Sequence, residues 1–429
     1  MLKRIRGGLI GALLVLAACA TPQAGPSAVN AIAQDYVRLA LEIDKLEEGY
    51  VDAYIGPAEL REAIRATPPR STAELRTEAD RLLAPLRALR PSDRLEAARV
   101  RYLIASIESM RFRLDMIEGV RRPFVEEAQA LFALTPPLQP LSAYDGALAR
   151  VEALAPGAGP LSERVDAIRA RYAIPADRLR AVMDAAIAEC RRRTAHYIAL
   201  PEGEAFTMEF VTGQSWSAYN WYQGANRSLI QVNTDQGVTI DRALGLGCHE
   251  GYPGHHVQSL AAERNYRERG WAEQSVILLY NPAAPLWEGG GNYGVELAFP
   301  GEERTAFERD VLFPLAGLDP ATAQAFVDLR AALGALAGAR LTIAQQFLDG
   351  EITREEAIAL TQRYQLVSRA RAGQSLRFTE HYRSYVINYV SGEDIVRAYV
   401  ERAGPSAEAR WAAYQHIIST PVLPQDLAP

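Results

Sequence analysis

The sequence is poor in lysine and has no basic run beyond its N-terminus. Lysine occurs only at positions 3 and 45 of the 429 residues, and the formal net charge is −6. A protein that binds nucleic acid needs a concentrated positive surface, which this composition does not provide. We therefore expect no nucleic acid among the partners of this chain.

The apolar run at the N-terminus, LIGALLVLAA, is shorter than the roughly 20 residues that a membrane-spanning helix requires. It follows the positive segment MLKRIRGG, as in a bacterial secretory signal. The residues LAAC at 16–19 resemble a lipobox, which implies cleavage before Cys19 and lipidation of that cysteine. We expect a signal peptide over 1–18, a lipidated flexible tether over 19–28, and a lipid-anchored protein on the outer membrane, facing the periplasm. An ordinary secretory signal with a chance cysteine is the alternative.

Cysteine is scarce, and only Cys190 and Cys248 remain after the N-terminal segment. In an oxidising periplasm these two residues could pair, but sequence alone does not place them close together. Cys248 adjoins His249, so a role as zinc ligand is the rival of simple packing as a small apolar residue.

Apolar residues at three- and four-residue steps predict helices over 31–46, 73–89, 93–116 and 177–199. The fold class is therefore mainly α, with a helical N-terminal half over 29–198. A metal-binding catalytic half follows over 199–429, and 29–429 is expected to form one compact unit.

Residues 205–234 differ, because aromatic and β-branched residues broken by glycines predict a short antiparallel sheet of two or three strands beside the active-site helix. The helical pattern returns at residue 241. Its expected breaks lie near Pro282, Pro300, Gly317, Gly350, Gly373 and Gly404.

The stretch HEGYPGHH, residues 249–256, opens like the zinc-hydrolase motif H-E-x-x-H but has Pro253 at the position of the second histidine. A proline inside a helix clashes with the carbonyl four residues earlier, so we predict that the helix breaks over 250–254. A two-residue bulge would bring His255 to the ligand position beside His249, with His256 as the alternative ligand. The bland interpretation is a surface turn, but apolar helical segments flank the motif on both sides.

A third ligand is expected from a carboxylate on a following helix, since zinc hydrolases use two or three protein ligands and an open position for water. The segment LWEGGGNYGVELA, residues 286–298, offers Glu288 and Glu296. Glu288 is the better candidate, because an unpaired buried carboxylate is costly and a metal would remove that cost. Glu296 is expected to form a salt bridge. We expect one Zn²⁺ ion.

These motifs resemble the Domain of Unknown Function 885 family of bacterial proteins, which is similar in turn to gluzincin-type helical metallopeptidases such as the carboxypeptidase Taq family. The match lies in His249, Glu250, Pro253, Gly254 and His255, then Glu288 and Gly289, then Tyr293 and Glu296, and finally Tyr389 and Gly392. The resemblance implies a helical fold with a deep channel, His249, His255 and Glu288 as zinc ligands, and Glu250 as general base. The family's Trp-Ala is replaced here by Gly290-Gly291, which we expect to widen the site.

The expected activity is metal-dependent hydrolysis of a peptide or small amide. Glu250 would take the proton of the attacking water, and Tyr389, with Arg383 as the next candidate, would stabilise the oxyanion. The segment RSLIQVNTD, residues 227–235, would be an edge strand that pairs with an extended peptide, with Asn233 and Asp235 near the substrate, or else simple scaffold. Tyr293 completes the substrate-binding candidates. The rivals are an amidase that acts on a non-peptide amide and a lipoprotein that binds metal or peptide without turnover.

Overall fold

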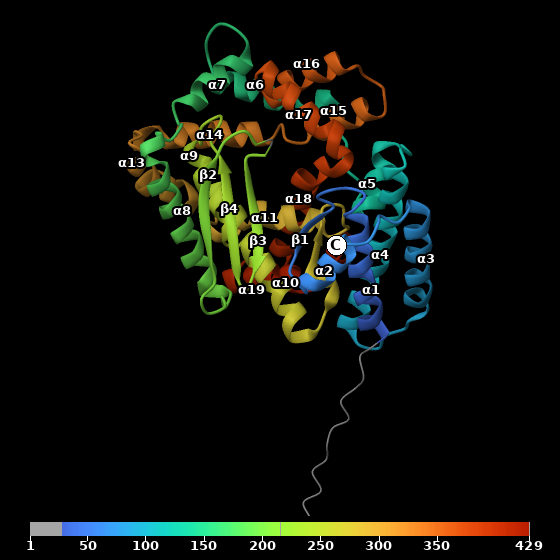
Figure 1. The fold of residues 1–429 in the computed structure, drawn as a ribbon. Coiled ribbons are helices and arrows are strands. Elements are labelled where there is room, and N and C mark those ends of the chain that lie inside the picture. The colour runs from blue at the N-terminus through green and yellow to red at the C-terminus, as the bar shows by residue number, and fades with distance from the viewer. Residues whose placement is uncertain (1–27, 215, 429) are drawn as a thin grey trace, which may run out of the picture.

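The computed structural model describes residues 28–214 and 216–428, and helices dominate it (Figure 1). The fold class is mainly α, as the sequence predicts. Within the described ranges, no helix has the length and apolar character that crossing a bilayer requires. The predicted signal peptide and Cys19 lie outside the described residues.

The four predicted N-terminal helices are confirmed within a few residues. α3 begins where Ser71 and Glu74 form a reciprocal capping box, and α4 begins where the Asp93 side chain accepts from the Glu96 amide. The helices of this half are α1 (Ala28–Ile43), α2 (Ala58–Arg65), α3 (Thr72–Ala88), α4 (Arg94–Ile117), α5 (Phe124–Phe132), α6 (Asp145–Leu154), α7 (Leu161–Ala170) and α8 (Ala176–Tyr197).

A three-stranded sheet follows α8, but it is mixed rather than antiparallel as expected. Its strands are β2 (Ala205–Val211), β3 (Ala218–Gly224) and β4 (Arg227–Asn233), in the order β2-β4-β3. β4 pairs antiparallel with β3 and parallel with β2. Its alternating residues Ser228, Ile230 and Val232 are buried, so the strand with the buried face occupies the centre. β3 is therefore an edge strand, and β4 is not.

A second, two-stranded sheet was not expected from the sequence. β1 (Val51–Tyr54) pairs antiparallel with β5 (Val276–Leu278), although the pattern around β5 predicted a helix. The pairing joins segments that lie more than two hundred residues apart, so no local periodicity carries it. It attaches the N-terminal half to the half of the chain that begins at residue 199.

The second half is helical with short interruptions, as predicted. Gly317 and Gly350 end helices with φ of +70° and +76°. Gly373 does not, because it lies within a helix whose neighbouring residues Ala372 and Leu376 pack into a buried cluster. The helices are α9 (Ile240–Leu246), α10 (His255–Arg269), α11 (Ala284–Ala298), α12 (Glu303–Phe307), α13 (Phe313–Ala316), α14 (Ala323–Gly334), α15 (Ala339–Leu348), α16 (Arg354–Gln365), α17 (Arg369–Tyr382), α18 (Asn388–Arg402) and α19 (Ala407–Ser419).

α11 and α18 cross at two glycines. A Cβ added to Gly289 would lie 2.2 Å from the Gly392 carbonyl oxygen, and one added to Gly392 would lie 1.9 Å from the Pro285 oxygen. The backbones therefore touch, which only glycine permits at both positions. This contact fixes Glu288, the residue before Gly289, relative to Tyr389 on α18. The two largest core clusters each contain residues from both halves of the chain.

Candidate metal centre

The helix breaks at the predicted place. α9 runs into a π-helical turn, η2 (Gly247–Gly251), and α10 begins at His255 after a cis Tyr252-Pro253 bond. The Gly254 amide donates to the Cys248 carbonyl at 3.0 Å. A Cβ on Gly254 would lie 1.8 Å from the His249 carbonyl oxygen, so this tight reversal requires glycine.

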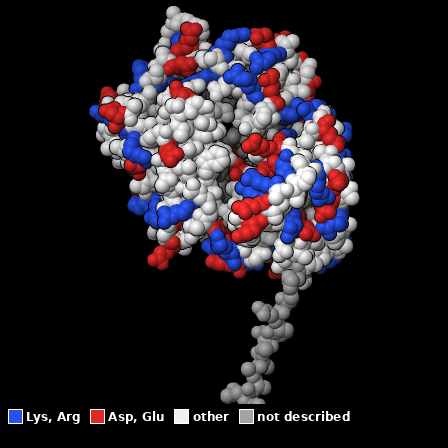
Figure 2. All heavy atoms as spheres, in the orientation of Figure 1, with Lys and Arg blue, Asp and Glu red and all other residues white. Residues whose placement is uncertain are grey.

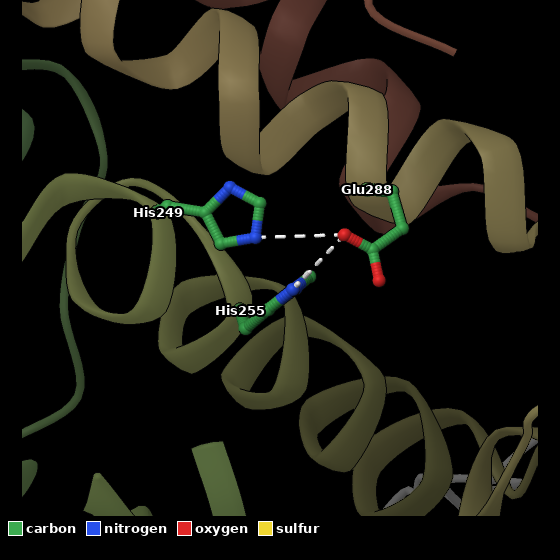
Figure 3. Close-up of side chains that lie close together, drawn as sticks. All are labelled: His249, His255 and Glu288. Carbon is green, nitrogen blue, oxygen red and sulfur yellow. Dashed lines mark ion pairs between the residues drawn. The ribbon is translucent and has the colours of Figure 1, made fainter. Parts of the chain in front are cut away.

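The reversal brings His249 and His255 together and turns both rings toward Glu288 on α11 (Figure 3). The Nε2 atoms of His249 and His255 lie 3.5 Å and 3.9 Å from Glu288 Oε2. One ligand atom from each residue falls within 4.8 Å of the others. These are the three residues that the sequence predicted as metal ligands.

The trio fits a metal ion. Glu288 Oε1 accepts a hydrogen bond from the Tyr385 hydroxyl at 3.1 Å, whereas Oε2 is buried and has no hydrogen-bond partner. A buried carboxylate oxygen without a partner is costly, and here it faces two imidazole nitrogens. Two histidines and one carboxylate are one of the ligand sets of catalytic zinc sites, which keep a further position open. Tyr385 holds the carboxylate through its other oxygen.

The charges around the trio favour a cation. Burial alone would lower the pKa of His249, but Glu288 and Glu250 outweigh it and raise that pKa to about 8. Burial would raise the pKa of Glu288, yet His249 and His255 bring it below its usual value. The Glu288 carboxylate is thus ionised at neutral pH, and its negative charge attracts either a proton on His249 or a metal ion.

The sequence did not reveal one acid of this site. Asp52 on β1 lines the same cavity, and burial, together with Glu288 and Glu250, raises its pKa to about 7. The sequence of residues 51–54 does not identify Asp52 as a site residue, because only the pairing of β1 with β5 brings it near the metal trio.

The trio lies in a cavity of about 840 Å³, within the range of ligand sites. Glu250 lines this cavity, and its backbone carbonyl accepts from Asn220 Nδ2 on β3 at 2.7 Å. The cavity is also lined by Tyr389, by residues 218–220 of β3 and by residues 216 and 217 just before that strand. Figure 2 shows this face of the molecule hollowed near its centre, with the side over the three-stranded sheet mainly uncharged.

His256, the alternative ligand, lies outside the trio. It is fully buried, with Nδ1 2.7 Å from the Ser228 hydroxyl and Nε2 3.0 Å from Glu204 Oε2. Both ring nitrogens are therefore committed to the sheet side of α10. Both histidines lie in the first turn of α10, where consecutive side chains point about 100° apart, so of the two only His255 faces Glu288.

The Glu204 network yields a stability prediction. Burial would raise the pKa of Glu204, but hydrogen bonds from His256, Tyr252 and Arg191 lower it from 4.5 to about 2. A group with a depressed folded-state pKa contributes stability above its unfolded pKa, here 4.5, and loses it as pH falls through 2. We expect Glu204→Gln to lower the free energy of unfolding of the metal-free protein by roughly 3 kcal/mol at pH 7. Denaturant titrations at pH 7 and pH 2.5 check this, and an equal loss at both would contradict it.

Three predicted substrate contacts are placed elsewhere. Asn233 Nδ2 donates to the Gln214 and Trp216 carbonyls, both at 3.0 Å, and Asp235 Oδ2 accepts from the Gly213 amide at 2.8 Å. These two side chains close the loop that connects β2 to β3, because β4 is central and its end meets that loop. Tyr293 is buried in the core, with the Arg397 guanidinium 5.2 Å from its ring centre. None of the three lines the cavity.

Arg383, the second oxyanion candidate, is also committed elsewhere. Its guanidinium pairs with the buried carboxylate of Glu127 on α5, with one contact at 2.8 Å. Its φ of +52° ends α17, so residues 378–392 are not the single helix that we expected. The tyrosine rings still meet in succession, since Tyr385 and Tyr389 have ring centres 5.8 Å apart. Tyr389 lines the cavity, as its proposed role requires.

Gly290 and Gly291 do not widen the cavity, contrary to the expectation. A Cβ on Gly291 would lie 2.8 Å from the His249 ring, and one on Gly290 would lie 2.8 Å from Gln258 Nε2. Both glycines instead make room for side chains of the metal-site helix, since Gln258 Oε1 also lies 2.8 Å from His255 Nδ1. They let α11 approach the two histidines closely.

Cys190 and Cys248 form a disulfide with a Cα–Cα distance of 5.5 Å. The bond ties η2 to α8, and it removes Cys248 from the possible metal ligands. Glu296 pairs with Arg397, as the salt-bridge interpretation predicted.

Comparisons with known proteins show a related fold but no family. No known family model matches the chain, and no curated protein matches it. The crystal structure of a candidate lipoprotein from Colwellia psychrerythraea has 13% sequence identity and a TM-score of 0.52, over 86% of this chain and 68% of that one. An M32 carboxypeptidase from Deinococcus radiodurans R1 has 14% identity and a TM-score of 0.36, over 91% of this chain and 88% of that one. The first likeness concerns the fold alone, and the second is too distant to carry an argument.

Proposed function

We propose that this protein is a zinc-dependent hydrolase of peptide bonds. The observation that carries the proposal is the convergence of three groups inside a large cavity: the buried Oε2 of Glu288, which accepts no hydrogen bond, lies 3.5 Å and 3.9 Å from the Nε2 atoms of His249 and His255. Glu250 lines the same cavity directly after His249, so a base stands beside the ligand trio. Pure metal storage has no use for such a base.

The chemistry divides between the ion and the side chains of the chain. Zinc, when held by His249, His255 and Glu288, polarises a carbonyl and makes water a better nucleophile near neutral pH. Glu250 takes the proton of the attacking water and delivers it to the leaving amine. Tyr389 donates its hydroxyl hydrogen to the oxygen on which negative charge develops. Tyr385 orients the Glu288 carboxylate.

The substrate we propose is an extended peptide that pairs with the free edge of β3. The sequence led us to expect that β4 pairs with the peptide, but the sheet order places β4 in the centre. We therefore assign the pairing with the peptide to β3, which lines the cavity. Asn220 on β3 has a buried Oδ1 without a hydrogen-bond partner, while its Nδ2 holds the Glu250 backbone. That oxygen is available to accept a hydrogen bond from a substrate amide.

The proposal is tested by metal content and by hydrolysis of a mixed peptide library, with wild type and Glu250→Gln side by side. Metal-dependent cleavage by the wild type supports it. Equal metal in both proteins with turnover in neither would favour a binding lipoprotein, and cleavage of non-peptide amides alone would favour an amidase.

We propose that the chain is related to the Domain of Unknown Function 885 family and is carried to the cell envelope. The lipobox-like LAAC at 16–19 supports a lipid anchor, and the Cys190–Cys248 disulfide is typical of an oxidising compartment such as the periplasm. The proposed outer-membrane location rests on Ala20, because an alanine rather than an aspartate after the lipidated cysteine resembles the outer-membrane class of lipoproteins.

Removal of the anchor should release the protein. We expect Cys19→Ala to move the protein from the membrane fraction to the soluble periplasmic fraction, because a lipid chain supplies its membrane affinity. Cell fractionation with immunoblotting measures this. A wild-type protein that is already soluble, or that keeps its signal peptide, would refute the lipobox.

A further inference from the structure

Arg340 is a cation in the cavity wall for which the described part of the chain supplies no acidic partner. It lies in the first turn of α15 and lines the cavity. Its guanidinium carbon is 5.5 Å from the ring centre of Phe378 and 5.7 Å from that of Tyr389. Both rings line the cavity as well, so the guanidinium lies against aromatic rings within the cavity wall.

Other cavity arginines differ from Arg340. Arg304 pairs with Glu308 at 2.8 Å, and Arg242 is exposed. Within residues 28–214 and 216–428, no aspartate or glutamate forms an ion pair with Arg340, and its buried Nε has no hydrogen-bond partner. Burial lowers the pKa of Arg340, opposed only by the nearby Tyr389. An arginine that is desolvated without a counter-ion is costly, and a bound anion would remove that cost.

Arg340 and the metal trio occupy different parts of the cavity, and these two parts differ in charge. Its guanidinium neighbours the Tyr389 ring, the Tyr389 ring neighbours that of Tyr385, and the Tyr385 hydroxyl binds Glu288. Around the trio the cavity wall is acidic, with Asp52 and Glu250, and it repels anions. Arg340 offers the opposite charge on the far side of the tyrosines.

We propose that Arg340 binds a carboxylate of the substrate and so determines specificity. The planar guanidinium matches a carboxylate with two parallel hydrogen bonds, a geometry that lysine cannot reproduce. The carboxylate is either the free C-terminus of a peptide or an acidic side chain. This inference rests on the proposed function for the reaction, but the binding of the carboxylate does not require turnover.

A binding experiment tests the inference without catalysis. Three peptides of one length are titrated calorimetrically into the zinc-loaded Glu250→Gln protein: one with a free C-terminus, the same peptide as C-terminal amide, and an amidated peptide ending in glutamate. We expect one carboxylate form to bind about 10- to 100-fold more tightly than the plain amide, the scale of a charge-assisted hydrogen bond. Tighter binding of the peptide with a free C-terminus would identify the C-terminal carboxylate as the bound group, and tighter binding of the amidated peptide ending in glutamate would identify an acidic side chain. Equal binding of all three overturns the inference, whether or not the wild type hydrolyses anything.

Variants separate carboxylate binding from mere packing. Arg340→Met should abolish the preference between carboxylate and amide peptides, and Arg340→Lys should retain part of it. Arg193→Met is the matched control, because Arg193 lies 4.1 Å from the Phe299 ring centre but outside the cavity lining, and it should keep the full preference. If Arg340→Met weakens both peptides equally, Arg340 only supports the wall and the inference is wrong. Should Arg340→Met fail to fold, Arg340→Lys and the wild-type comparison decide.

If the wild type hydrolyses peptides, KM and kcat give a second measure. In Arg340→Met the ratio of kcat/KM for the free-carboxylate substrate to kcat/KM for the amide substrate should fall to about one. Hydrolysis by the wild type with no preference for a carboxylate would sustain the proposed function and overturn this inference. A carboxylate preference in binding without any hydrolysis would do the reverse.

Discussion

Replacement of His255 by alanine is expected to empty the metal site, lowering bound zinc from about one ion per chain to near none and abolishing hydrolysis with it. His255 supplies one of the three ligand atoms that lie within 4.8 Å of one another. His256 does not replace it, since both of its ring nitrogens are held by Ser228 and Glu204. Elemental analysis after dialysis against trace zinc measures the loss.

His256→Ala is the matched control for that experiment. It should keep its zinc, but it should unfold more easily, because the substitution leaves the buried Ser228 and Glu204 without their shared partner. Metal loss in His256→Ala together with full retention in His255→Ala would reverse the ligand assignment and require a different path for the chain after Pro253.

The metal trio could be predicted from the sequence because the residues that shape the chain around it are neighbours in the sequence. Pro253 removes an α-helical hydrogen bond, the glycines around it permit a reversal, and a reversal of that size presents His255 instead of His256. The structure realises this with a π-helical turn followed by a new helix. Glu288 was accessible for a different reason, since a carboxylate inside an apolar helical segment needs a partner. The four long N-terminal helices followed from periodicity alone.

The cavity that surrounds the trio could not be predicted from the sequence, because its wall is assembled from segments that lie far apart in the chain. Asp52 arrives through a three-residue strand pairing, and Arg340 is aligned by the rings of Phe378 and Tyr389. Asn233 and Asp235 were assigned to the substrate on the assumption that β4 is an edge strand. Strand order depends on which face is buried, and alternation within one strand does not reveal its neighbours. Arg383 adopts a positive φ to meet Glu127, which no helical pattern announces.

Replacement of Glu250 by glutamine is expected to lower kcat by about 10²- to 10⁴-fold while the protein keeps its zinc, its fold and a nearly unchanged KM. Glutamine has the shape of glutamate but cannot accept the proton of the attacking water. The metal should remain, because Glu250 is outside the ligand trio. The strand edge should remain as well, because Asn220 binds the backbone carbonyl of residue 250 and not its side chain. Steady-state kinetics on a cleaved library peptide, with metal content measured on the same samples, check both parts.

Asp52→Asn is the variant that makes this result specific, since Asp52 also lines the cavity and its pKa of about 7 suits a proton-accepting role at neutral pH. If Glu250 is the base, Asp52→Asn should change kcat far less than Glu250→Gln does. Its effect should appear around pH 7, where the Asp52 carboxyl loses its proton, because asparagine carries no charge at any pH. A Glu250→Gln enzyme with wild-type kcat, beside an inactive Asp52→Asn enzyme with full zinc, would transfer the role of base from η2 to β1.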